Sequence, residues 1–85
     1  MDIADIERRV RQIIYETTNI EPVEIGTHAH FVDELDFDSL TLLEIGVNVD
    51  QEFRLDLPEE EMKQMVDLQA TVDLVVSHLE KKAVG

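Results

Sequence analysis

Apolar side chains recur at intervals of three and four residues along most of this chain, and no segment shows the alternating pattern of a half-buried strand. Such spacing gathers apolar residues on one face of a helix. It is clearest in the first segment, where the apolar face consists of Ile3, Ile6, Val10, Ile13, Ile14 and Thr17. The pattern therefore predicts an all-α protein.

Helix-start residues predict where the next two helices begin. Asp38 and Ser39 are both favourable at a helix N-terminus, and they predict a second helix that begins at or beside Ser39 and runs to Arg54. Pro58 is followed by three glutamates, which predicts a short third helix to about Met65, because proline and acids favour the first turn of a helix.

The last predicted helix follows Asp67, which is suited to cap it. Its apolar face consists of Leu68, Val72, Val75 and Leu79. Residues 18–38 follow no period and contain Pro22 and Gly26, which predicts a long loop between the first two helices. Residues 1–85 are thus expected to form one domain, a small four-helix bundle with a short third helix.

The charge of the chain is concentrated in its middle. Residues 1–17 hold four acids and three bases, residues 18–61 hold thirteen acids and one base, and residues 62–85 hold three of each. This distribution repels nucleic acids and anionic membranes, so we expect neither as a partner, and it favours proteins with basic surfaces. A solvated acidic face without any partner is the alternative interpretation.

Length and composition exclude further classes. The 85 residues hold one modest core but no cleft between two lobes, so we do not expect an enzyme that acts alone. The absence of cysteine excludes disulfides and thiolate metal sites. No run approaches roughly 18 apolar residues, and no signal segment follows Met1, so we expect a cytoplasmic protein, and a monomer.

The predicted second helix is apolar on two sides. One stripe consists of Leu42, Ile45, Val49 and Phe53, and the opposite strip consists of Leu40, Leu43 and Val47. Three neighbouring helices can hardly cover both sides, so the strip is expected to meet a partner, with the acids Glu44, Asp50 and Glu52 attracting a basic surface. Alternatively, the long loop folds over these leucines.

Ser39 is a poor candidate for a catalytic nucleophile. The Gly-x-Ser-x-Gly pattern of hydrolases is absent, since Phe37 and Thr41 stand where its glycines would be. His28 and His30 are two possible bases in the loop, but two histidines in a polar loop are more often exposed residues without a catalytic role. A calcium loop that starts at Glu34 fails as well, because its sixth position would be Ser39 instead of glycine and its twelfth Ile45 instead of glutamate, so we expect no metal site.

The segment Phe37-Asp38-Ser39-Leu40, at the start of an acidic helix, resembles the acyl carrier proteins. The likeness spans most of the chain and includes these features: the first helix, the loop with Phe31-Val32, the Asp38-Ser39-Leu40 motif, Glu44, Glu52-Phe53, Leu57-Pro58 and the helix after Asp67. Asp-Ser-Leu alone is a weak signal, but it is strong in this position with this charge.

The resemblance implies that Ser39 accepts a phosphopantetheine arm through a phosphodiester, transferred from coenzyme A by a separate phosphopantetheinyl transferase with a magnesium ion. The thiol of the arm carries acyl groups as thioesters, which suits a chain without a competing cysteine. Asp38 is expected to cap the helix or to help hold the magnesium ion of the transferase. A freestanding carrier without catalysis of its own is implied.

The resemblance also implies two sets of contact residues. Those that meet the transferase and acyl-processing synthases with basic docking patches are Leu40, Glu44 and Val47, and Leu43, Glu52, Glu59 and Glu60 are expected to extend this surface. The positions between which an acyl chain withdraws match Phe31, Val32, Val49, Leu57, Met62, Met65 and Leu74. Ordinary core packing is the alternative for the second set, although Met62 and Met65 are flexible enough to repack around a guest.

Three departures from fatty-acid carriers leave the pathway open. Thr41 stands where many of them have an acid, Arg54 interrupts the acidic helix, and Gly46 lies in mid-helix at a cost of about 1 kcal/mol relative to alanine. Polyketide carriers share the motif around Ser39, so acyl transport in fatty-acid or polyketide synthesis is expected. The alternatives are a peptidyl or aminoacyl carrier, an unmodified acidic helical adaptor that uses the strip Leu40, Leu43 and Val47, and a divalent-ion binder.

Overall fold

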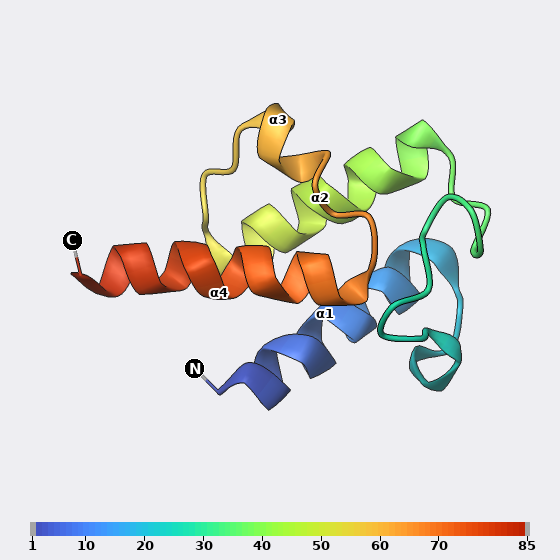
Figure 1. The fold of residues 1–85 in the computed structure, drawn as a ribbon, viewed down its shortest axis with the longest axis horizontal. Coiled ribbons are helices and arrows are strands. Elements are labelled where there is room, and N and C mark those ends of the chain that lie inside the picture. The colour runs from blue at the N-terminus through green and yellow to red at the C-terminus, as the bar shows by residue number, and fades with distance from the viewer. Residues whose placement is uncertain (1, 85) are drawn as a thin grey trace.

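The computed structural model describes residues 2–84, with the side chains of residues 2–81. Within that part of the chain the regular secondary structure is all helical, as predicted (Figure 1). The elements are α1 (Ile3–Thr18), a 3₁₀ turn η1 (Pro22–Glu24), α2 (Ser39–Phe53), α3 (Glu59–Met62) and α4 (Leu68–Val84). The small four-helix bundle with a long connection after the first helix is therefore confirmed.

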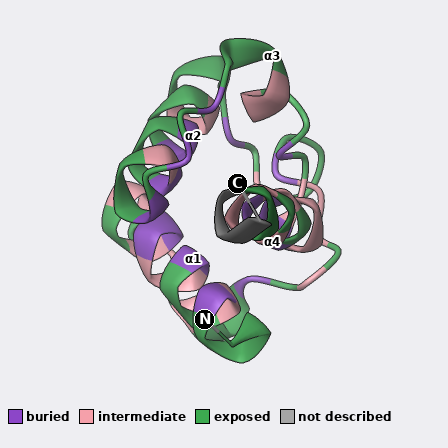
Figure 2. Ribbon diagram, turned by 90° about the vertical axis from the view of Figure 1, so that its left-hand side faces the viewer, coloured by how far each residue is buried: buried purple, intermediate pink, exposed green. Residues whose placement is uncertain are grey.

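Helix α1 packs against both α2 and α4 through its apolar face. Ile6, Val10, Ile13 and Ile14 are buried, as their spacing predicts, whereas Ile3 in the first turn is exposed. Figure 2 shows that the buried residues of α1 and α2 lie on the sides that face α4. The predicted core stripe of α2 is buried at Ile45, Val49 and Phe53 and half-buried at Leu42.

Two phenylalanines anchor the long connection between α1 and α2 in the core. Phe31 is fully buried, and its ring lies 5.4 Å from that of Phe37. The backbone N–H of Phe31 donates to the carbonyl of Val66, and Gln69 N–H donates to the Thr27 carbonyl, so the connection is also bound to the start of α4. Phe37 lies two residues before α2, so its contact with Phe31 places the start of α2 beside the core.

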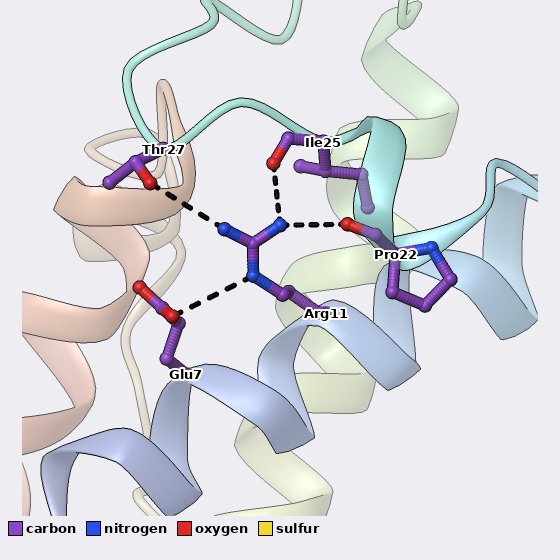
Figure 3. A network of polar contacts seen from close by, with 5 residues as sticks. All are labelled: Glu7, Arg11, Pro22, Ile25 and Thr27. Atoms are coloured by element: carbon purple, nitrogen blue, oxygen red, sulfur yellow. Dashed lines mark hydrogen bonds and ion pairs between the residues drawn. The ribbon is translucent and has the colours of Figure 1, made fainter.

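Arg11 of α1 holds the first half of the same connection (Figure 3). Its Nη1 donates to the carbonyls of Pro22 at 2.7 Å and Ile25 at 2.5 Å, and Nη2 donates to Thr27 Oγ1 at 3.5 Å. Its Nε lies 3.7 Å from a carboxylate oxygen of Glu7. One guanidinium therefore satisfies the carbonyls of Pro22 and Ile25, which lie in the connection before Phe31 enters the core. Its planar group of donors ties this long segment to α1.

Helix α3 sits directly on the middle of α2. A Cβ on Gly46 would lie 3.2 Å from Sδ and Cγ of Met62, so glycine permits this close approach and a larger residue would require Met62 to shift. On the other side of α3, Glu61 Oε2 lies 3.0 Å from Nε2 of His78 on α4. The mid-helix glycine thus has a packing reason that its cost in helix propensity does not reveal.

The end predicted for the short helix was wrong by three residues. We expected the helix to continue to about Met65, but α3 ends at Met62, and the next residues form tighter turns in which Gln64 and Met65 donate to carbonyls three residues back. This change of direction buries Met65. The free energy gained by burying the Met65 side chain exceeds what a further turn of so short a helix would contribute, because a four-residue helix is only marginally stable by itself.

Candidate functional site

Ser39 is the first residue of α2 and is exposed to solvent. The preceding residue, Asp38, caps the helix: its Oδ1 accepts a hydrogen bond of 2.8 Å from the Thr41 backbone N–H. This hydrogen bond lowers the pKa of the Asp38 carboxyl. The predicted cap is therefore confirmed, and it fixes the backbone on which the Ser39 hydroxyl is displayed.

The two loop histidines differ in what they do. His30 Nδ1 accepts hydrogen bonds of 3.2 Å from the backbone N–H groups of Val32 and Asp33, and Glu34 Oε2 accepts one from the His30 N–H. The ring of His30 thus shapes the turn after it. His28 is exposed. Neither ring forms a hydrogen bond with Ser39 in the described chain, so no base is paired with this hydroxyl.

A cavity of about 400 Å³ adjoins Ser39. The loop contributes His30 and Val32, α2 contributes Ser39, Leu42 and Leu43, and the segment at and after α3 contributes Glu59, Met62, Lys63, Met65 and Val66. Most of these side chains are apolar, and the volume is that of a small-molecule site. The serine therefore opens onto a compartment that can shelter an apolar group.

The residues expected to surround an acyl chain divide into two groups. Val32, Met62 and Met65 line the cavity. Phe31, Val49, Leu57 and Leu74 do not line it; the first three are buried and Leu74 packs against the core. Six further residues line the cavity that were not expected to surround an acyl chain, although Leu43 and Glu59 were assigned to the partner surface: His30, Leu42, Leu43, Glu59, Lys63 and Val66. Of these, Leu42 and Leu43 carried a signal, because they lie three and four residues after Ser39 and so on its side of the helix.

The apolar strip of α2 lies open. Leu40, Leu43 and Val47 are 64%, 42% and 37% exposed, so the alternative in which the long loop covers them is wrong. Glu44 is exposed beside this strip. Contiguous exposed apolar residues mark interaction sites in soluble proteins.

The acids assigned to the partner surface do not form one group. Glu44 and Glu52 line a polar hollow of about 550 Å³ that also includes Glu16 and Thr17 of α1. Glu52 points toward α1, where its Oε2 lies 3.3 Å from Nε of Arg9. Glu59 and Glu60 are exposed on α3. Glu44 therefore lies between the apolar strip and this hollow, whereas Glu52 is already paired with Arg9 of its own chain.

Two general properties complete the description. None of the described helices combines the length and the apolar character needed to cross a bilayer. Among the described side chains, no three of His, Asp or Glu lie close enough together to hold a metal ion.

Comparison with known proteins connects this geometry with a family. The family described as "Phosphopantetheine attachment site" matches residues 8–75. A solved structure of the acyl carrier protein from Enterococcus faecalis, described in work on its high thermal stability, superposes with a TM-score of 0.75 at 24% sequence identity. The match covers 92% of this chain and 99% of that protein, and it shows that the two share a fold. The chain belongs to the phosphopantetheine attachment family, and its cofactor is phosphopantetheine.

Proposed function

We propose that this protein is an acyl carrier protein of fatty-acid or polyketide synthesis, with Ser39 as the residue that bears the phosphopantetheine arm. The observation that carries the proposal is the exposed Ser39 hydroxyl on the first residue of α2, at the edge of a largely apolar cavity. The protein itself catalyses no reaction in this proposal. It presents one acyl group at a time to separate enzymes.

The residues around Ser39 fit a phosphodiester. The hydroxyl is accessible to a transferase, and the first turn of α2 directs backbone N–H groups and the positive end of the helix dipole toward it. The negative charge of Asp38 repels the phosphodiester, but the hydrogen bond from the Thr41 N–H offsets part of this charge. When bound, the arm supplies a terminal thiol that carries acyl groups as thioesters.

The exposed face of α2 supports delivery to separate enzymes. Leu40, Leu43 and Val47 offer apolar area, and Glu44 adds a negative charge at its edge. Because apolar burial contributes affinity and charge steers the encounter, this face suits the phosphopantetheinyl transferase and synthases with basic docking patches. Glu59 and Glu60 on α3 extend the same negative character, and Glu52 is a weaker member because Arg9 already binds it.

The cavity supports partial shelter of the cargo. Met62 and Met65 line it, and methionine adapts its shape to an incoming apolar group more readily than branched side chains do. Phe31, Val49, Leu57 and Leu74 would take part only if the cavity widened toward the core.

Intact mass spectrometry tests the proposal directly. We would incubate the apo protein with coenzyme A, magnesium and a broad-specificity phosphopantetheinyl transferase, and compare it with Ser39→Ala and with Ser77→Ala, a control at an exposed serine of α4. The protein and the Ser77 variant should gain one arm, and the Ser39 variant none. A protein that gains no arm would instead be an unmodified helical adaptor. Loading with aminoacyl groups by an adenylating enzyme in preference to acyl groups would indicate a peptidyl carrier.

A further inference from the structure

Lys63 is an isolated base in an acidic part of the chain. Between Gln12 and Glu80, Arg54 and Lys63 are the only lysines or arginines. The three arginines of α1 each pair with an acid, whereas the ammonium of Lys63 forms no ion pair or hydrogen bond within the described residues. Glu59 lines the same cavity without forming an ion pair with it.

Lys63 also lies at the cavity that adjoins Ser39. The rest of the lining is largely apolar, with Leu42, Leu43, Met62 and Met65 among its members. A cation beside an apolar surface is complementary to a ligand that is apolar along its length and carries a negative charge. Lys63 is exposed, so a plain saturated chain leaves its ammonium to water, whereas a carboxylate on the ligand offers it a partner of opposite charge.

Lys63 follows α3, and the place at which α3 packs on α2 decides which anion the ammonium can meet. The preceding residue, Met62, packs on Gly46, which is seven residues beyond Ser39 and thus about 10 Å along the helix. A phosphate bonded to the Ser39 oxygen stays at the first turn, where helix N–H groups already face it. Ser39 and Lys63 line the same cavity, so Lys63 is placed to meet the far end of a group that folds back into it.

We propose that Lys63 recognises a carboxylate on the cargo, so that the cavity selects acyl groups derived from dicarboxylic acids over plain saturated chains. This inference rests on the proposed attachment of the arm to Ser39. The ammonium pairs with the carboxylate farthest from the thioester, and the apolar lining of the cavity contacts the methylene groups between them. Lys63 acts as a point charge on a flexible stem, so it follows carboxylates of more than one chain length.

The test compares two cargoes that differ in one group. The apo protein would be loaded by a broad-specificity transferase with hexanoyl or adipoyl pantetheine arms, the adipoyl carboxylate being labelled with ¹³C, and intact mass would verify loading. NMR titration at low ionic strength would give the pKa of that carboxylate. The variants are Lys63→Met, which keeps the aliphatic stem, Lys63→Arg, which keeps the charge, and Lys81→Met, a control for an exposed lysine outside the cavity.

The expected result is a carboxylate pKa about half a unit to one unit lower than in free adipoyl-pantetheine, because a nearby cation favours the charged form. Lys63→Met should abolish this shift, and Lys63→Arg and Lys81→Met should retain it. The rise in melting temperature on adipoyl loading should fall in Lys63→Met, while that on hexanoyl loading should not.

Three outcomes would overturn the proposal. A carboxylate pKa that is the same with and without Lys63 would show that the charges do not meet. An equal effect of Lys63→Met on the holo, hexanoyl and adipoyl forms would assign the ammonium to the phosphodiester of the arm. Absence of any arm on Ser39 would appear in the mass spectrum before the NMR titration. It would contradict the proposed function as well as this inference.

Discussion

The carboxylate of Asp38 and the backbone N–H of Thr41 are joined by a hydrogen bond of 2.8 Å across Ser39 and Leu40. The same bond that begins α2 thus fixes the residue that we assign to the prosthetic group. Because a capping side chain sets the direction from which a chain enters a helix, Asp38 determines how the serine is displayed.

The first prediction concerns the stability of the Asp38 cap at low pH. The bond from Thr41 lowers the pKa of Asp38 in the folded protein, so the cap contributes stability above the unfolded value of about 3.9 and loses it as the pH falls through the lower folded value. Chemical shifts of Asp38 and of the Thr41 amide should titrate together below about pH 4. Asp38→Asn, which also caps helices, should abolish this transition and keep the Thr41 amide protected, whereas Asp38→Ala should lose that protection at all pH values.

A second prediction concerns Gly46 and Met62. Gly46→Ala improves the helix propensity of α2 by about 1 kcal/mol, but the new methyl group would press on Met62 at 3.2 Å and 3.3 Å. Since Met62 Cβ is among the atoms in contact, α3 itself must shift. We expect a free energy of unfolding within about 1 kcal/mol of the wild-type value, together with faster amide exchange in α3.

The control for this prediction is the double variant Gly46→Ala with Met62→Ala. Met62→Ala removes Cγ and Sδ, which relieves the two contacts at 3.2 Å, and leaves the Cβ contact at 3.3 Å, so slow exchange in α3 should return only in part. Unchanged exchange in the single variant would show that α3 does not depend on this close contact.

The sequence predicts what local patterns control, and the structure adds what distant contacts control. The start of α2 and the cap at Asp38 follow from neighbouring residues and were predicted correctly, and the end predicted at Arg54 lies one residue beyond Phe53, where α2 ends. The role of Arg11 was not predicted, because its partners are carbonyls 11 and 14 residues away, and every residue type has a carbonyl. The anchoring of the long connection therefore lies beyond local pattern.

The same reasoning explains the cavity. Its position depends on the docking of α3 at Gly46, and the single signal for that docking was a mid-helix glycine with no evident purpose. Phe31 and Val49, which were expected to surround an acyl chain, are fully buried in the core beside the cavity and do not line it. Periodicity separates buried from exposed faces, yet it does not tell a filled core from a cavity that adjoins it.

A third prediction concerns Glu44, which is exposed on the face of α2 that we assign to partners. Glu44→Lys should lower kcat/KM of phosphopantetheine transfer by about three- to tenfold through slower encounter, because like charges then face each other. The loss should shrink as salt rises. Far-UV circular dichroism should stay unchanged, since the described residues include no ion-pair partner of Glu44.

Glu80→Lys is the matched control, since it makes the same change of charge on an exposed residue of α4. Transfer kinetics that fall equally in both variants would assign the effect to net charge and not to this face. Kinetics that change in neither would exclude a charged docking surface at α2.

The last prediction concerns the clamp formed by Arg11. Arg11→Ala leaves the carbonyls of Pro22 and Ile25 without their donor, which should lower the free energy of unfolding by about 1–3 kcal/mol in urea denaturation. Arg11→Lys should recover only part of this loss, because an ammonium lacks the planar fork that serves both carbonyls. Arg8→Ala is the control: its ion pair with Asp5 is exposed, so its removal should change stability by no more than about 0.5 kcal/mol. Equal losses in the Arg11 and Arg8 variants would mean that the long connection holds its conformation without the guanidinium.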